Sequence, residues 1–187
     1  GPYFAKGVNP VSIWVAQDFH RAGAGGTGAA KCGGNYAASL LPQQEAADKG
    51  CDQVAFLDAS TNTALEELGG MNLFVVGADR TVSTPALTGS ILEGVTRRSI
   101  LELVADRGYD VQERTITLAE VRQGLEDGSI LELFACGTAA VLTPIGRLAG
   151  EGFDLTVGDG TSGGLTMSVR EELTDIQNGK RPDTRGW

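Results

Sequence analysis

The sequence predicts a mixed α/β fold organised as one domain. Short apolar runs of β type alternate with helical patterns along the chain, which is typical of mixed α/β domains. A length of 187 residues is enough to bury one well-filled core. No internal repeat, coiled-coil pattern or low-complexity tract divides the chain, so a single domain over residues 1–187 is the simplest organisation.

The first half of the chain contains three expected strands and one expected helix. Residues 10–16 form a strand-like run, and residues 54–57 and 73–76 are compact apolar runs that end at turn residues. Residues 33–49 have a helical pattern whose apolar face is expected to contain Leu40, Leu41 and Ala47. Pro42 is expected to kink this helix or to mark its true start, because proline lacks the backbone donor that a helix interior needs.

Three segments of the second half are expected to be helical. Residues 95–107 carry Ile100, Leu101, Leu103 and Val104 on one side, and the helix is expected to end at Gly108. Thr117 and Glu120 have the spacing of a capping box, which opens a helix that runs to about residue 127. Residues 165–177 are the last expected helix.

Two strands are expected between these helices. Residues 130–134 and 139–142 are apolar runs that flank a Gly137-Thr138 turn. After the last helix, residues 180–187 are expected to be an extended tail.

Charge and cysteine content narrow the range of partners. The formal net charge is -9, which repels a phosphate backbone, so nucleic acid is not an expected partner. No apolar run is long enough to cross a bilayer, so no membrane contact is expected. The three cysteines are an odd number without metal-type spacing, which indicates a reducing cytoplasm and no metal site.

Lys31 is the first candidate for chemistry. It closes the glycine-rich run of residues 25–31, and the phenol of Tyr36 follows a few residues later. Glycines let backbone pack closely against a flat ligand, so this lysine suits a Schiff base with an aldehyde cofactor. The alternative is an ordinary solvated lysine, which is the commoner case in proteins.

The same glycines suggest two nucleotide-binding motifs, and neither fits well. A dinucleotide fingerprint needs the glycines directly after a strand, whereas polar residues 17–21 intervene here. A phosphate-binding P-loop needs Gly-Lys-Ser/Thr, and the chain has Ala30-Lys31-Cys32 instead.

Three later segments have the chemistry that a phosphorylated aldehyde cofactor needs. Glu67, at the edge of an expected strand, can keep a pyridine nitrogen protonated. Val95 and Thr96 open a helix whose free amides form an anion site. Thr138 and Ala139 lie in a small-residue turn that can aim amides at a phosphate or carboxylate. Each segment alone is more commonly a solvated glutamate, a plain helix start or a tight turn.

Taken together and in this order, the segments resemble the branched-chain amino acid aminotransferases, which are fold-type IV pyridoxal-phosphate enzymes. The likeness runs through nearly the whole chain. The matching stretches are Gly25-Gly26-Thr27-Gly28 with Lys31, Gly33-Gly34-Asn35-Tyr36, Gln43-Gln44-Glu45-Ala46, Gly50-Cys51-Asp52-Gln53-Val54, Glu67 with Gly69 and Met71-Asn72-Leu73-Phe74, Gly94-Val95-Thr96-Arg97, Gly137-Thr138-Ala139 and Leu173-Thr174-Asp175-Ile176-Gln177.

The resemblance implies a pseudo-barrel of mixed strands flanked by helices, with pyridoxal 5'-phosphate as the cofactor. Lys31 matches the lysine that forms the Schiff base, and Tyr36 matches the phenol that hydrogen-bonds to the ring oxygen. Glu67 matches the carboxylate at the pyridine nitrogen.

The resemblance also assigns the groups that bind anions. Val95 and Thr96 match the phosphate-binding helix start. Thr138 matches a residue that contacts the phosphate, and with Ala139 it lies in the turn whose amides receive the substrate carboxylate.

The implied activity is transamination of leucine, isoleucine and valine with 2-oxoglutarate by a homodimer, giving branched-chain 2-oxo acids and glutamate. The chain is expected to be the C-terminal cofactor-binding domain, with residues 1–9 as a remnant of the interdomain linker and 179–187 as a tail. Because the N-terminal domain of the family is expected to be missing, the fragment itself is expected to turn over poorly.

Three alternatives stay open at this point. Two are fold-type IV enzymes that use the same lysine and carboxylate, namely a D-amino acid aminotransferase and an aminodeoxychorismate lyase. The third is a non-catalytic fragment that binds cofactor or supports oligomerisation.

Overall fold

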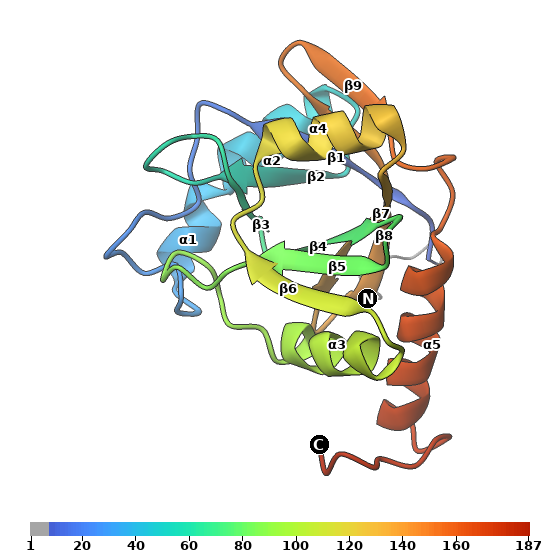
Figure 1. Cartoon of the computed structure of the whole chain (residues 1–187). Helices are drawn as coiled ribbons and strands as arrows, with labels where there is room; N and C mark the ends of the chain where they lie inside the picture. Colours follow the sequence, from blue (N-terminus) through green and yellow to red (C-terminus); the bar gives the residue numbers. More distant parts are fainter. Residues whose placement is uncertain (1–7) are drawn as a thin grey trace.

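The computed structural model describes residues 8–187, so most of the expected linker remnant lies outside the described residues. Within this range nine strands and five helices alternate (Figure 1). The strands are β1 (Val11–Ala16), β2 (Gln53–Leu57), β3 (Leu65–Leu68), β4 (Asn72–Gly77), β5 (Thr81–Pro85), β6 (Asp110–Arg114), β7 (Ile130–Gly137), β8 (Val141–Gly150) and β9 (Phe153–Thr156). The helices are α1 (Gly33–Ala38), α2 (Leu40–Asp48), α3 (Val95–Asp106), α4 (Leu118–Asp127) and α5 (Gly164–Gln177).

The strands form one mixed sheet that closes into a barrel. The sheet order is β3-β2-β1-β8-β7-β4, and β3 also pairs with β4, which completes the ring. β1 is parallel to both of its neighbours, whereas the β4–β7 and β7–β8 pairs are antiparallel. β5 and β6 extend the sheet from β4, and β9 adds to β8. The prediction of a mixed α/β barrel flanked by helices is confirmed.

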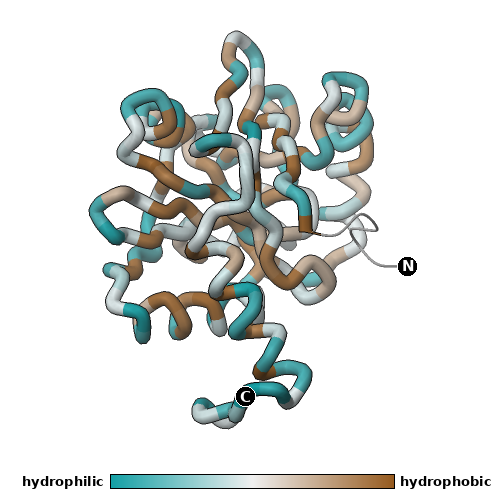
Figure 2. Tube along the Cα trace, turned by 90° about the vertical axis from the view of Figure 1, so that its right-hand side faces the viewer, coloured by the Kyte–Doolittle hydropathy of each residue, from teal (hydrophilic) through white to brown (hydrophobic). Residues whose placement is uncertain are grey.

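Both faces of the barrel wall are buried. Successive side chains of a strand point to opposite faces, so alternate residues pack in the interior and under the helices. On β4, Leu73 and Val75 belong to the interior cluster, whereas Phe74 and Val76 belong to an outer cluster under the helices. The Phe74 ring stacks on the Phe134 ring with 4.9 Å between centroids. Full burial of each such side chain contributes roughly 1.5–3 kcal/mol. Figure 2 shows hydrophobic residues mainly in the inner segments of the trace and hydrophilic residues mainly in the outer turns.

The helices cover different parts of this wall (Figure 1). α3 and α5 pack Ile100, Leu103 and Val169 against the outer face of β4, β7 and β8. α2 lies along β2. α4 lies against β7 and β9 and adds residues to the interior cluster. Among residues 8–187, no helix is both long and apolar enough to span a bilayer.

Helix α4 confirms the prediction made from its two ends. The Thr117 side chain accepts a hydrogen bond from the Glu120 backbone N–H at 3.1 Å, and Gly128 ends the helix with a φ of 78°. The Glu120 carboxylate does not complete the capping box. It pairs instead with Arg114 at the end of β6.

The expected helix over 33–49 is two helices, and its apolar face was predicted wrongly. α1 ends at Ala38 and α2 begins at Leu40, so the break precedes Pro42, which fits the first turn of α2. Leu40 and Leu41 are 71% and 57% exposed, and Ala47 is exposed as well. α2 instead buries Pro42 and Ala46, four residues apart on one side.

The second-half strands are longer than predicted, and four strands were not predicted. β7 continues to Gly137, and β8 begins at Val141 rather than Ala139 and runs for ten residues. The missed strands β3, β5, β6 and β9 are four or five residues long. The other predicted strands and helices are present within one or two residues of their expected ends.

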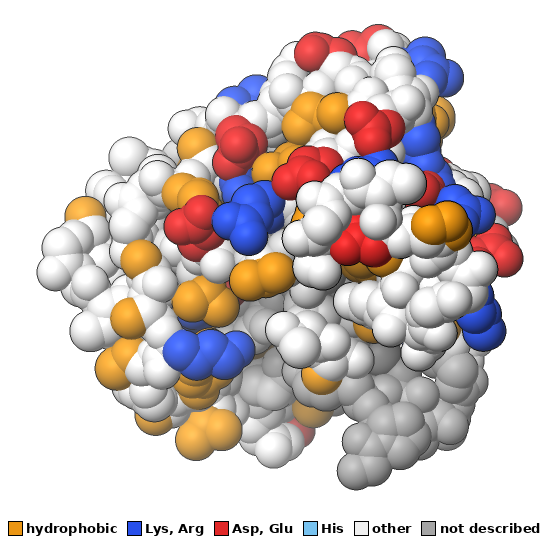
Figure 3. All heavy atoms as spheres, turned by 90° about the horizontal axis from the view of Figure 1, so that it is seen from below, with side chains coloured by type: hydrophobic (Ala, Val, Ile, Leu, Met, Phe, Trp, Pro, Cys, Tyr) orange, Lys and Arg blue, Asp and Glu red, His pale blue; other side chains and the backbone are white. Residues whose placement is uncertain are grey.

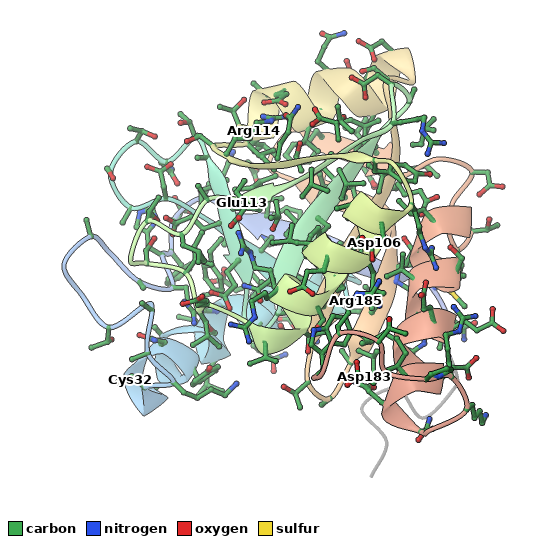
Figure 4. All side chains as sticks on the ribbon, turned by 60° about the horizontal axis from the view of Figure 1, so that its bottom comes forward. Cys32, Asp106, Glu113, Arg114, Asp183 and Arg185 are labelled. Carbon is green, nitrogen blue, oxygen red and sulfur yellow. The ribbon has the colours of Figure 1, made fainter. Side chains whose placement is uncertain are left out.

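The C-terminal tail is held against the helices. Asp183 accepts hydrogen bonds from the backbone N–H groups of Arg185, Gly186 and Trp187. The Arg185 side chain pairs with Asp106 at the end of α3, and Figure 4 shows these residues together there. The tail is therefore turned and held by these contacts rather than extended.

Acidic and basic side chains lie interspersed on the face seen in Figure 3.

Candidate active site

A cavity of about 500 Å³ opens at one end of the barrel. Its walls come from four places in the sequence: the segment that contains Lys31 and Tyr36 together with the start of α2, Gln53 at the start of β2, the β3–β4 turn, and the β7–β8 turn that contains Thr138 and Ala139. Four of the residues predicted from sequence therefore line one cavity. The antiparallel pairing of β4 with β7, which sets Asn72 opposite Cys136, is what brings the two turns to the same end.

Lys31 and Tyr36 lie next to each other in this cavity. The Lys31 Nζ is 5.4 Å from the centroid of the Tyr36 ring. The Tyr36 hydroxyl is buried and has no hydrogen-bond partner among the described residues. A buried hydroxyl without a partner is costly, so this one is suited to bind a polar group that enters the cavity.

Asn35 holds the lysine loop in position. Its side-chain amide donates hydrogen bonds to the backbone oxygens of Thr27 at 2.8 Å and Ala30 at 3.0 Å. The Thr27 hydroxyl donates to the Asn35 side-chain oxygen at 2.7 Å. These bonds tie the glycine-rich loop to the first turn of α1, so Lys31 and Tyr36 keep a fixed relation.

Glu67 is buried beside the cavity. Its side chain is 2% exposed, on the strand that leads into the β3–β4 turn. Oε2 accepts a hydrogen bond from the Leu92 N–H at 3.0 Å and pairs with Arg21 Nη1 at 3.1 Å. Among residues 8–187, the structure gives Oε1 no hydrogen-bond partner.

Burial raises the pKa of Glu67 to about 7. The positive charges of Arg21 and Lys31, and the Leu92 N–H, act in the opposite direction on this pKa, whereas the neighbouring Glu66 adds to the increase. The charge of this carboxylate is therefore set by its neighbours, and Lys31 is close enough to be one of them.

Val95 and Thr96 are not part of the cavity wall. They begin α3. The N-cap residue is Gly94, so no side chain caps the first amides of the helix, and Val95 is 70% exposed. The helix start is nevertheless fixed to the Glu67 region. A Cβ on Gly94 would lie 2.2 Å from the Asn72 side-chain oxygen, so only glycine allows this close approach. Asn72 is the β4 residue that pairs with Glu67.

The β7–β8 turn is strained. Val141, directly after the small residues that line the cavity, has a φ of 58°, a left-handed conformation that β-branched residues avoid. Such a conformation costs roughly 1–2 kcal/mol. Strain of this kind persists only where the surrounding structure imposes it, and it is common at binding sites.

Comparison with known proteins identifies the family. The family model described as "Amino-transferase class IV" matches residues 9–148. The chain belongs to the class IV aminotransferases.

The individual relatives and solved structures to which the chain is similar include branched-chain amino acid aminotransferases. The branched-chain-amino-acid aminotransferase of Mycolicibacterium smegmatis is 50% identical over 190 residues, covering 100% of this chain and 52% of the relative. The crystal structure of the Escherichia coli branched-chain amino acid aminotransferase superposes with a TM-score of 0.83 at 33% identity, covering 100% of this chain and 58% of that one. The branched-chain amino acid aminotransferase of T.th., complexed with N-(5'-phosphopyridoxyl)-L-glutamate, gives a TM-score of 0.80 at 32% identity, covering 95% and 55%.

The chain spans about half the length of the curated relatives it matches. The comparisons show the family and the fold of the described part.

Two residues around the candidate site were not predicted from the sequence. The sequence gives Asn35 only as part of a stretch that matches the family, with no role of its own. An asparagine next to a glycine-rich run is nevertheless a common hydrogen-bond partner of loop backbone. Arg21 gave no local signal, because its partners Glu67 and Ser90 lie far along the chain. No group of three or more His, Cys, Asp or Glu side chains in the described part of the chain is arranged to hold a metal ion.

Proposed function

We propose that the whole protein is a pyridoxal-phosphate-dependent aminotransferase that transfers the amino group of leucine, isoleucine or valine to 2-oxoglutarate. One observation carries the proposal: Lys31, Tyr36 and the Thr138 turn share one cavity beside the buried Glu67. The name of the M. smegmatis relative supports the substrate class, and the phosphopyridoxyl-glutamate ligand of the similar crystal structure supports the cofactor.

The residues present fit pyridoxal phosphate. The buried Tyr36 hydroxyl lacks a partner among residues 8–187 and can donate to the phenolic oxygen of the ring. Glu67 has Oε1 available for the pyridine nitrogen, while Oε2 is fixed by protein groups. The Thr138 hydroxyl and the uncapped amides of Val95 and Thr96 are suited to the phosphate.

When bound, the cofactor supplies an aldehyde that condenses with an amine and a cationic ring that accepts the electron pair of the substrate Cα–H bond. Lys31 Nζ is the base that removes the α-proton and later returns it, since it is the amine in the cavity. Glu67, when ionised, stabilises the protonated pyridine nitrogen. Tyr36 orients the ring, and the amides of Thr138 and Ala139 hold the substrate carboxylate.

We further propose that this chain is the C-terminal, cofactor-binding domain of a homodimeric cytoplasmic enzyme. The exposed Leu40 at the rim of the cavity, with the exposed Leu41 beside it in sequence, supports a covering domain or subunit, because apolar side chains at a functional rim are typically covered. The three cysteines are unpaired, which favours a reducing compartment.

The lysine assignment is tested by borohydride reduction of the protein with pyridoxal phosphate. We expect a stable pyridoxyl adduct that mass spectrometry of peptides places on Lys31 and that Lys31→Ala abolishes. Lys49→Ala is the matched control, since the Lys49 ammonium lies 4.4 Å from the Trp14 ring, outside the site, and its adduct yield should equal that of the wild type. An adduct of full yield in Lys31→Ala contradicts the proposal.

The reaction is tested with the whole protein on a panel of amino donors. Leucine, isoleucine and valine should give glutamate from 2-oxoglutarate at much higher rates than D-alanine. Faster turnover of D-alanine, or release of pyruvate from aminodeoxychorismate, would instead identify one of the two other fold-type IV activities. Adduct formation without turnover of any donor by the whole protein would indicate a non-catalytic binding domain.

A further inference from the structure

Arg21 is a buried cation at the junction of the site. Its side chain is 2% exposed, and Nη1 lies 3.1 Å from Glu67 Oε2. The same nitrogen donates hydrogen bonds to the backbone oxygens of Ser90 at 3.0 Å and Gly28 at 3.4 Å. The guanidinium carbon is also 6.0 Å from the centroid of the Tyr36 ring. One side chain therefore contacts the carboxylate, the phenol and two loops.

The position is costly for an arginine. Nε and Nη2 are buried without a hydrogen-bond partner in the described part of the chain. A buried ion pair is often no more stable than well-packed apolar residues of the same volume, and unmet donors add to the cost. Net stability alone therefore does not explain a guanidinium at this position.

We propose that Arg21 is a positioning residue for the transamination: its guanidinium keeps the Glu67 carboxylate ionised and in place to pair with a protonated pyridine nitrogen. The inference rests on the proposed function and deepens it. Arg21 touches Glu67 and Tyr36 and needs no direct contact with the cofactor or substrate.

The charge balance around Glu67 supports this role. Burial favours the neutral carboxylic acid, and the groups that oppose it are Arg21, the Leu92 N–H and Lys31, whereas Glu66 favours the neutral form. Lys31 must lose its charge to act as a base, so it does not favour the ionised Glu67 carboxylate throughout the reaction. Arginine stays charged at every working pH, which makes Arg21 the lasting counter-charge of Glu67.

Arg21 also fixes the two loops that carry the reacting groups. The Ser90 backbone passes so close to Gly28 that a Cβ there would lie 2.1 Å from the Ser90 oxygen. Arg21 Nη1 binds both backbone oxygens at this crossing. The Ala29 N–H adds a hydrogen bond to the Gly89 oxygen at 3.0 Å. The lysine loop and the loop before α3 are thus held together at the point where Arg21 meets Glu67.

The test uses the whole enzyme loaded with ¹⁵N-labelled pyridoxal phosphate and the variants Arg21→Met and Arg21→Lys. The ¹⁵N chemical shift reports directly whether the ring nitrogen is protonated. We expect a protonated nitrogen in the wild type and in Arg21→Lys, and a largely unprotonated nitrogen in Arg21→Met at neutral pH. Arg21→Met should also lower kcat by about tenfold or more, with KM for leucine changed much less.

Arg107→Met is the matched control. Arg107 forms an ion pair with Glu172, with 2.6 Å between Nη2 and Oε2, and neither residue lines the cavity. It should retain the wild-type nitrogen signal and kcat. If Arg21→Met does not fold, Arg21→Gln gives the same comparison with a polar neutral side chain.

A double-mutant cycle separates action through Glu67 from a general effect on folding. If Arg21 acts through Glu67, adding Arg21→Met to Glu67→Gln should lower kcat little further. Additive losses, or a protonated nitrogen and wild-type kcat in Arg21→Met, would overturn the inference. Failure of the proposed function itself looks different, because the wild type would then form no Lys31 adduct and give no bound ¹⁵N signal.

Discussion

Replacing Glu67 by glutamine should change how stability depends on pH. The pKa of Glu67 is about 7 in the folded chain against 4.5 for an ordinary glutamate, because the carboxyl is buried. A folded-state pKa above the unfolded value gives stability that is fully present at low pH and is lost as pH rises through about 7. Proton linkage between pH 5 and pH 8 gives a loss of about 2–3 kcal/mol from this group. Glu67→Gln cannot titrate, so it should not show this loss.

The assay is urea denaturation of the cofactor-free protein and of Glu67→Gln at several pH values from 5 to 8. The free energy of unfolding of the wild type, minus that of the variant, should fall by about 2–3 kcal/mol over this range. The partner that Arg21 loses in the variant adds only a constant, because arginine side chains do not titrate in this pH range. Glu171→Gln, on an exposed position of α5, measures the general effect of removing one negative charge. A difference that is flat or rises with pH would refute the reasoning.

Three further predictions concern other parts of the chain. In the folded protein a thiol reagent should label Cys32, which is half-buried at the start of α1 (Figure 4) and has its pKa lowered by the Gly34 backbone N–H. The two buried thiols, Cys51 and Cys136, should react only after unfolding. Peptide mass spectrometry of the labelled protein measures both outcomes. Gly28→Ala should destabilise the fold by about 1–3 kcal/mol in urea denaturation, because its Cβ would meet the Ser90 backbone, and Gly33→Ala, which has open space, should not. Thr117→Ala should cost about 1 kcal/mol in the same assay through loss of the α4 cap, and Thr117→Ser should restore most of it.

Local signals in the sequence predicted the helices better than the sheet. The α4 helix follows from Thr117 and Gly128, because a cap and a left-handed glycine act on their own neighbours. Strand β6 could not be recognised, since its sequence is polar and its five residues are half-buried or exposed. It exists because it pairs in parallel with β5, which is a tertiary contact.

The same distinction applies to the site. Lys31 could be predicted because the glycines around it are adjacent in sequence. Leu40 and Leu41 were assigned to the core by their apolar character, but they are exposed, and Leu40 lies at the rim of the cavity. Arg21 could not be predicted from any pattern, because its partners converge only when the barrel closes.

Closure of the barrel and assembly of the site depend on the same residue pair. Glu67 and Asn72 are the partners through which β3 meets β4. Both also hold the backbone of Leu92: Glu67 accepts a hydrogen bond from the Leu92 N–H at 3.0 Å, and Asn72 donates one to the Leu92 carbonyl oxygen at 3.0 Å. The loop before α3 is thereby fixed by the residues that complete the ring of strands. A change that opens the β3–β4 pairing should therefore displace the carboxylate and the α3 helix start together, so the proposed nitrogen-binding and anion-binding ends of the site are not independent of the fold.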